Sequence, residues 1–201
     1  MADFCTVANV EDLLQVEISD ADKVDSAERA ITAATAAIRN YCHQTIEKVE
    51  DDVYTFDLFA PVWNLVLPEM PVISVASVIE DGETLTEGSD EDYVVMNYGQ
   101  IRRVGSRWET GPQIIVVTYT HGYETIPDDV VDVCTRAAAR AYQAGLLASE
   151  MEAVPGIESK SIGDFSVSYG SGGDLSMGVS GARMLLMSEK DLLDKYRYVG
   201  P

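Results

Sequence analysis

The feature that most constrains the fold of this chain is a change of hydrophobic period along its length. Residues 24–41 place apolar side chains at alternating steps of three and four, the period of an α-helix. The same period returns over residues 130–142, after a helix start at Pro127. Between them, residues 51–120 hold β-branched runs separated by turn residues, which predicts short antiparallel strands. The sequence therefore predicts an α+β fold.

The two helical stretches carry mostly alanine on their apolar faces. Small side chains allow another helix to approach closely, so we expect a tight helix pair or a contact between subunits. Periodicity alone leaves these two alternatives open, although we assign Ile31 and Ile38 to the core of the subunit. Shorter helices are expected over residues 9–17 and near the C-terminus, where residues 184–196 form one helix or two.

The β-rich stretch holds four runs with strand character. Proline, Asp-Gly and Asn-Tyr-Gly turn signals separate them and favour a meander. The expected strands are residues 53–59, 72–79, 93–96 and 114–119. We therefore expect one domain over residues 1–201: a helical bundle of long antiparallel helices from residues 1–50 and 121–201, with an antiparallel β-meander inserted at residues 51–120.

Acidic residues outnumber basic residues by 34 to 14, for a formal net charge of −20. Tight binding to nucleic-acid phosphates needs clustered Lys and Arg, so this balance argues against it. The same charge makes self-association costly unless apolar contacts, local ion pairs or cations offset the repulsion.

Nothing in the chain predicts a secreted or membrane protein. Cys5, Cys42 and Cys134 are odd in number and have no CxxC spacing, which favours reduced thiols over a disulfide framework. The start has no basic and apolar signal-peptide pattern, and residues 114–117, the most apolar run, are far shorter than the roughly 20 residues of a membrane helix. We expect a soluble intracellular protein.

The patterns of catalytic and metal sites are weak. The glycine-rich run that contains Gly170, Gly172, Gly173 and Asp174 lacks the Gly-Lys-Ser/Thr ending of a phosphate loop and reads as a flexible loop. His43 and His121 show no zinc-ligand spacing, and no Gly-x-Ser-x-Gly elbow occurs. The acidic residues at 80–82 and 87–92 miss the offsets of a calcium loop and read as solvated loops. We expect no enzyme, no cofactor and no metal.

One ordered set of segments is more specific. A strand ends at His121-Gly122-Tyr123, and Ile126-Pro127-Asp128-Asp129 then opens the alanine-rich helix that contains Arg136 and Arg140. Four other segments stand in a fixed order along the chain: Val10-Glu11-Asp12-Leu13, Met70-Pro71-Val72, residues 92–95 and residues 158–169. Together these segments resemble the head-to-tail connector family (adaptor or head completion proteins) of long-tailed double-stranded DNA phages.

The resemblance implies a structural protein in the neck of a virion, assembled in the host cytoplasm. Its members form a ring that matches the twelve-fold portal, join the capsid to a stopper or tail, and leave a channel through which DNA passes without specific binding. An acidic channel wall would repel phosphate, and the loop with Gly170, Gly172, Gly173 and Asp174 is a candidate for that wall or for a partner contact. Another neck or tail-completion protein is the alternative, and a small intracellular enzyme is a weaker one.

Two sets of interface residues are predicted. Arginines suit bidentate pairing across a ring contact, and the candidates are Arg29, Arg39, Arg136 and Arg140. In proteins that the chain resembles, the C-terminal helix reaches the portal, and Tyr196, Arg197 and Tyr198 have the composition of interface anchors. The alternative, a C-terminus folded back on its own core, stays open.

Overall fold

The computed structural model describes residues 2–152, 159–162, 165–168 and 184–198. The chain divides into two compact units. The helical unit is Asp3–Ile38 with Asp129–Asp191, and the strand unit is Met1–Ala2, Arg39–Asp128 and Leu192–Pro201. This division does not test the prediction of a single connector domain, which stays a prediction.

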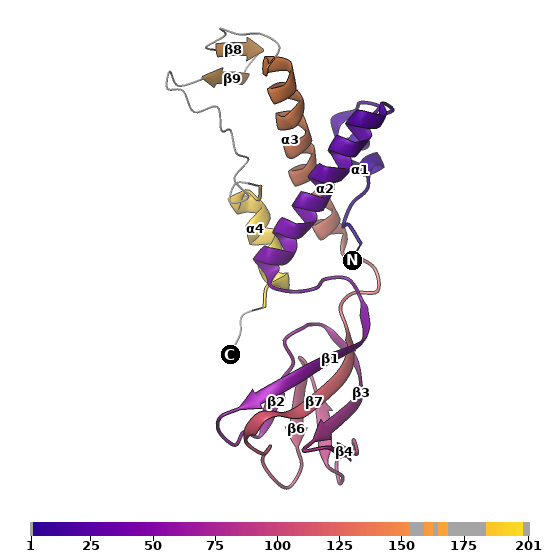
Figure 1. The fold of residues 1–201 in the computed structure, drawn as a ribbon, viewed down its shortest axis with the longest axis vertical. Coiled ribbons are helices and arrows are strands. Elements are labelled where there is room, and N and C mark those ends of the chain that lie inside the picture. The colour runs from indigo at the N-terminus through magenta and orange to yellow at the C-terminus, as the bar shows by residue number, and fades with distance from the viewer. Residues whose placement is uncertain (1, 153–158, 163–164, 169–183, 199–201) are drawn as a thin grey trace. The chain divides into compact units, whose positions relative to one another are not determined.

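The helical unit is built on two long helices, α2 (Ala21–Cys42) and α3 (Asp128–Glu152) (Figure 1). The shorter helix α1 (Val7–Leu14) begins at Thr6, which exchanges cap hydrogen bonds with Asn9. The other elements are α4 (Met187–Leu193), the 3-10 turn η2 (Asp194–Tyr196), and the paired strands β8 (Ser159–Ile162) and β9 (Phe165–Ser168).

The alanine stripes of α2 and α3 lie in the core of the subunit. The hydroxyl Oγ1 of Thr35 on α2 lies 3.5 Å from Sγ of Cys134 on α3. The buried residues of the two helices within the helical unit are Ala27, Ala30, Ile31, Ala34, Thr35 and Ile38 on α2, and Val130, Val133, Cys134, Thr135, Ala137, Ala138, Ala139 and Tyr142 on α3. Small side chains thus bring the helices close within one chain, and Ile31 and Ile38 are core residues as predicted.

The strand unit contains two antiparallel sheets (Figure 1). The first has the order β1 (Val49–Leu58), β7 (Gly111–His121), β3 (Val72–Glu80) and β4 (Glu83–Leu85). The second has the order β2 (Asn64–Val66), β6 (Gln100–Arg103) and β5 (Tyr93–Met96). One buried cluster takes side chains from both sheets, namely Leu65, Leu67, Val78, Tyr93, Ile101, Trp108, Ile115, Val117 and Tyr119. The two sheets therefore share one hydrophobic core.

The predicted architecture, a bundle of long helices with an inserted meander, is wrong. Among the described helices only α2 and α3 are long, with 22 and 25 residues, whereas α1 and α4 have 8 and 7. The strands do not form a meander either, because β7, the last of them in the chain, lies between β1 and β3. The strand unit has a core of its own, so the fold combines helices with two antiparallel sheets rather than decorating a bundle.

The turn His121-Gly122-Tyr123 joins three segments of the strand unit. The Gly122 N–H donates to the Pro71 carbonyl at 2.9 Å, and the Tyr123 N–H donates to the Ile46 carbonyl at 2.9 Å. Gly122 has a φ of +88°, and a Cβ there would meet the backbone carbonyl of Glu47. Only glycine can adopt this left-handed backbone and also approach Glu47 so closely, which explains why glycine occupies the turn.

Candidate functional site

The four arginines predicted at a ring contact all have contacts within the chain. Arg136 pairs with Asp132 one helical turn earlier, at 2.7 Å, and both side chains are about half exposed. Arg29 donates from Nε to the Asp25 carbonyl at 3.1 Å. These contacts do not test the predicted ring role, which stays a prediction.

Arg39, near the end of α2, forms an ion pair with Glu47, which lies in the segment between α2 and β1. Its Nη2 lies 2.6 Å from Oε1 of Glu47 and also donates to the Ala2 carbonyl at 2.6 Å. Both side chains of the ion pair are only 18% exposed. Within the strand unit Arg39 therefore has a structural partner.

Arg140 holds the start of α4 against α3 in the helical unit. Its guanidinium makes a bidentate pair with Glu189, at 2.6 and 2.7 Å, and Nη2 also donates to the Met184 carbonyl at 2.9 Å. Glu189 is 2% exposed, and its Oε2 accepts the N–H of Leu186 at 2.9 Å, just before α4 begins. The Glu189 carboxylate thus caps a helix, and Arg140 neutralises its buried charge.

Arg140→Ala should therefore destabilise the helical unit. The Glu189 carboxylate would be left buried without its cation, at a cost of about 2 to 3 kcal/mol, below that of a fully buried pair because Arg140 is itself 37% exposed. The matched control is Arg136→Ala on the same helix, whose exposed pair is worth about 0.5 kcal/mol or less. Urea unfolding followed by circular dichroism at 222 nm measures both, and equal losses would contradict the assigned role of Glu189.

The C-terminal cluster packs on its own chain. The Tyr198 N–H donates to the Cys42 carbonyl at 2.8 Å, and the ring of Tyr196 meets that of Tyr123 edge-on, with centroids 5.7 Å apart. The guanidinium of Arg197 lies 5.6 Å from the ring centroid of Tyr41. This is the folded-back arrangement, and Arg197 remains exposed. A portal contact through this cluster is not tested and stays a prediction.

The predicted channel or partner loop, with Gly170, Gly172, Gly173 and Asp174, lies outside the described residues.

None of the helices in the described part of the chain has the length and apolar composition of a membrane span.

The histidines do not form an arrangement suited to catalysis. His43 is exposed, whereas His121 is 1% exposed and lies 3.3 Å from Asp52, between Nε2 and Oδ2. The other ring nitrogen, Nδ1, is buried without a hydrogen-bond partner among the described residues, so no hydroxyl is aligned on it. Over the described segments, no three His, Cys, Asp or Glu side chains gather as metal ligands do.

The sequence did not predict that two cysteines meet. Cys5 and Cys134, which are 129 positions apart, are buried free thiols with their Sγ atoms 3.3 Å apart. The contact with Cys5 and burial raise the pKa of Cys134. Burial also raises the pKa of Cys42, to about 11, which keeps this thiol protonated at neutral pH.

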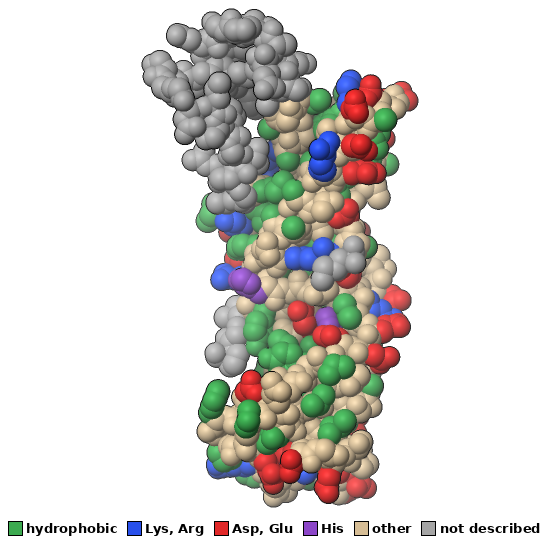
Figure 2. All heavy atoms as spheres, in the orientation of Figure 1, with side chains coloured by type: hydrophobic (Ala, Val, Ile, Leu, Met, Phe, Trp, Pro, Cys, Tyr) green, Lys and Arg blue, Asp and Glu red, His purple; other side chains and the backbone are tan. Residues whose placement is uncertain are grey.

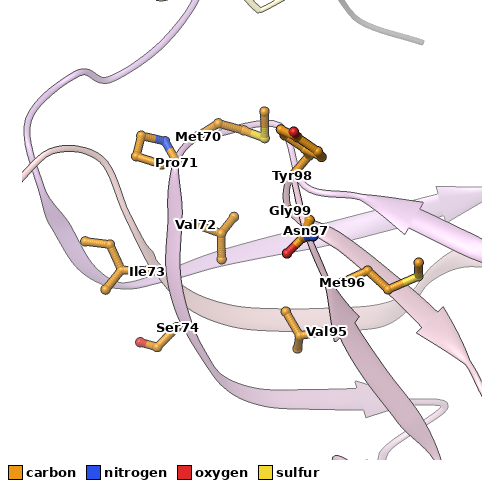
Figure 3. Close-up of a pocket in the computed structure, with 10 residues that line it drawn as sticks. All are labelled: Met70, Pro71, Val72, Ile73, Ser74, Val95, Met96, Asn97, Tyr98 and Gly99. Carbon is orange, nitrogen blue, oxygen red and sulfur yellow. The ribbon is translucent and has the colours of Figure 1, made fainter. Parts of the chain in front are cut away.

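The strand unit exposes an apolar hollow of about 280 Å³ beside the β5–β6 hairpin (Figure 3). The start of β3 and the hairpin line it, including Met70, Val72 and Tyr98. Ile73 and Tyr98 are 51% and 79% exposed. Figure 2 shows hydrophobic side chains (green) at the surface of this unit. None of the described residues that line it has an acidic or basic side chain, so the hollow fits a packing contact better than a reaction.

The loop between β1 and β2 carries a second exposed group that sequence reasoning missed. Phe59 is 98% exposed and Trp63 is 43% exposed. The guanidinium carbons of Arg102 and Arg107 lie 5.9 and 5.5 Å from the Trp63 ring centroid. Only the juxtaposition of three segments in space reveals this group.

Comparison with known proteins identifies the family. A family model described as "HCP: Head completion protein" matches residues 3–135, about two thirds of the chain. The chain belongs to the head completion protein family. The family match spans the helices α1 and α2, the seven strands of the strand unit and the start of α3, including the turn at Gly122. The C-terminal cluster of this head completion protein lies beyond the matched residues.

One solved structure shows the same fold for this member of the family, and a second matches the chain less closely. A chain from the structure "Neck of empty GTA particle computed with C6 symmetry" is 17% identical, with a TM-score of 0.51, and the match covers 97% of this chain and 90% of that one. A chain from "Neck of native GTA particle computed with C12 symmetry" is 15% identical, with a TM-score of 0.46, over 97% of this chain and 89% of that one. No curated protein sequence matches the chain.

Proposed function

We propose that this head completion protein is a structural subunit of the neck of a phage-like particle, where it forms an adaptor ring under the portal. The observation that carries the proposal is the family match over residues 3–135. The likeness in fold to a chain from a GTA particle neck supports it. The ring would join the capsid to the tail or stopper and would be assembled in the host cytoplasm.

The chemistry of the described residues agrees with a mechanical role rather than with an enzyme. The hollow of the strand unit is apolar, and the buried His121 has no hydroxyl aligned on its free nitrogen. The paired alanine-rich helices α2 and α3 favour an adaptor over another neck or tail-completion protein, for which we expect no such pair.

The net charge of −20 suits a ring around DNA. Carboxylates along a channel repel phosphates, so DNA would pass without binding. The ring would have the twelve-fold symmetry of the portal, and each contact in it would join two different surfaces of the chain.

Electron microscopy of the purified protein mixed with isolated portal tests this function. We expect closed rings seated on one face of the portal. Free portal beside unassociated chain, at every mixing ratio and salt concentration, would contradict the proposal.

Truncation after Asp194 should abolish portal binding in the same mixture. It removes Tyr196, Arg197 and Tyr198, the proposed portal anchors, while the alanine-rich helices remain. Truncation after Tyr198 is the matched control, and it should bind portal like the full chain. Co-sedimentation with portal measures both, with circular dichroism to verify that the variants are folded. Portal binding by the folded shorter variant would show that the cluster has only its role within the chain.

A further inference from the structure

Two arginines of the strand unit, Arg102 and Arg107, have no ion-pair partner among the described residues, although the chain is strongly acidic. Among the residues that the structure describes, neither Arg102 nor Arg107 has a carboxylate within ion-pair distance, and both side chains are exposed. Arg103, between them, is paired with Glu80 and Asp92 at 3.1 and 3.3 Å. The chain has 34 carboxylates, yet within its described part Arg102 and Arg107 face an aromatic ring and not an acidic side chain. An ion pair with a described side chain therefore does not account for their position.

This Arg–Trp patch, defined as Trp63, Arg102 and Arg107, is held by the backbone. The Arg103 N–H donates to the Trp63 carbonyl at 3.1 Å, and the Trp108 N–H donates to the Val62 carbonyl at 2.9 Å. The loop before β2 is therefore attached to the last residue of β6 and to the segment that follows it. A fixed aromatic ring with two guanidinium groups has the composition of an interface centre, and its charge calls for an acidic partner.

The same unit carries such an acidic surface on a loop at residues 87–92. Glu87, Asp90 and Glu91 are exposed and have no ion-pair partner among the described side chains. Hydrogen bonds close the loop: the Thr86 N–H donates to Oδ2 of Asp92 at 2.9 Å, and the Gly88 N–H donates to the Tyr93 carbonyl at 2.8 Å. This acidic loop is therefore also a built surface.

The sheet order places the two surfaces on opposite edges. In the order β2-β6-β5, Trp63 directly precedes β2, and the acidic loop directly precedes β5. Both edge strands run antiparallel to β6, so both begin at the end of the sheet where Arg102 lies. The β2 edge thus carries Trp63, whose ring Arg102 of the central strand and Arg107 face, and the β5 edge carries carboxylates at the same end of the sheet.

We propose that adjacent copies of this chain contact one another through their strand units, with the Arg–Trp patch of one copy against the acidic loop of the next. A ring needs two different, complementary surfaces on one chain; these two differ in charge, and Trp63 and the acidic loop adjoin opposite edge strands of the sheet. The contact also pairs charges where a net charge of −20 would otherwise drive the copies apart. The inference rests on the proposed function, because it assigns a contact within the proposed ring.

Charge reversal on each surface, and on both, tests the contact. The first variant is Arg102→Glu with Arg107→Glu, and the second is Glu87→Lys with Asp90→Lys and Glu91→Lys. Each should weaken ring formation at least about tenfold in apparent dissociation constant, because like charges then face each other. The chain with all five changes should recover most of the loss, because the signs are exchanged but still opposite.

Sedimentation velocity of each chain, alone and with portal, measures ring formation. Unchanged rings in the two single-surface variants, or no recovery in the combined variant, would overturn the proposed contact while leaving the neck function intact. A wild-type chain that forms no ring, alone or with portal, would overturn the proposed function and the contact with it. Matched variants Lys23→Glu and Asp12→Lys, in the helical unit, should form rings normally.

Binding of a labelled duplex DNA tests whether the partner of Arg102 and Arg107 is phosphate rather than the acidic loop of another copy. At about 100 mM salt, where charges interact over about 10 Å, we expect the wild-type chain to leave the duplex unbound. Binding that the Arg102→Glu, Arg107→Glu variant loses would assign the patch to phosphate and would overturn the contact between copies.

Discussion

Gly122→Ala is expected to destabilise the strand unit by about 2 to 5 kcal/mol. The left-handed backbone costs a residue with a Cβ roughly 1 to 2 kcal/mol, and the forced displacement of packed atoms adds about 1 to 3 kcal/mol. The new Cβ would lie 2.7 Å from the Glu47 carbonyl carbon and 3.0 Å from Cα of Lys48, both backbone atoms that cannot rotate away. Urea unfolding followed by tryptophan fluorescence measures the loss, since both tryptophans lie in this unit.

Gly82→Ala is the matched control for this change. Gly82 has a similar φ of +83°, but no atom lies within 4 Å of the position of its Cβ. It should lose only the backbone part, roughly 1 to 2 kcal/mol. Equal losses in the two variants would mean that the approach of Gly122 to Glu47 contributes nothing to the constraint.

Trp108→Ala is expected to cost about 3 to 5 kcal/mol, the usual range for removing a buried aromatic side chain. Trp108 is 0% exposed in the core shared by the two sheets, and its Nε1–H donates to the Ile101 carbonyl at 3.3 Å. The change leaves a cavity in the shared core and removes this hydrogen bond. Urea unfolding followed by circular dichroism in the β region measures the loss.

Trp63→Ala removes the other tryptophan and serves as the control. Because Trp63 is 43% exposed, its loss should cost less than about 1 kcal/mol of stability. The reverse order of the two losses would mean that the shared core of the sheets is misassigned.

The sequence was most informative where a pattern was long or a turn was distinctive. Residues 93–96 were predicted as a strand and form β5, and the two long helices lie where alanine recurs at helical spacing. Strands β2 and β4 have three residues each, too few for alternation to stand out. The place of β7 between β1 and β3 depends on pairing between distant segments, which local patterns do not encode.

The interaction surfaces were less predictable than the elements that carry them. The partner of Arg140 is 49 positions away, and whether an arginine is paired decides what it can offer to another chain. Arg102 and Arg107 both face the ring of Trp63, which lies about 40 positions earlier in the chain. No hydrophobic period in the sequence singles out Trp63, so only the fold reveals the Arg–Trp patch. The sequence identified the family correctly because its evidence was an ordered set of turns and helix starts rather than a single contact.

The central claim, that this protein joins heads to tails, can be measured on particles assembled without it. Electron microscopy of such a preparation should show separate heads and tails, and supplying the wild-type chain should join them. Particles that carry their tails in its absence would contradict the account.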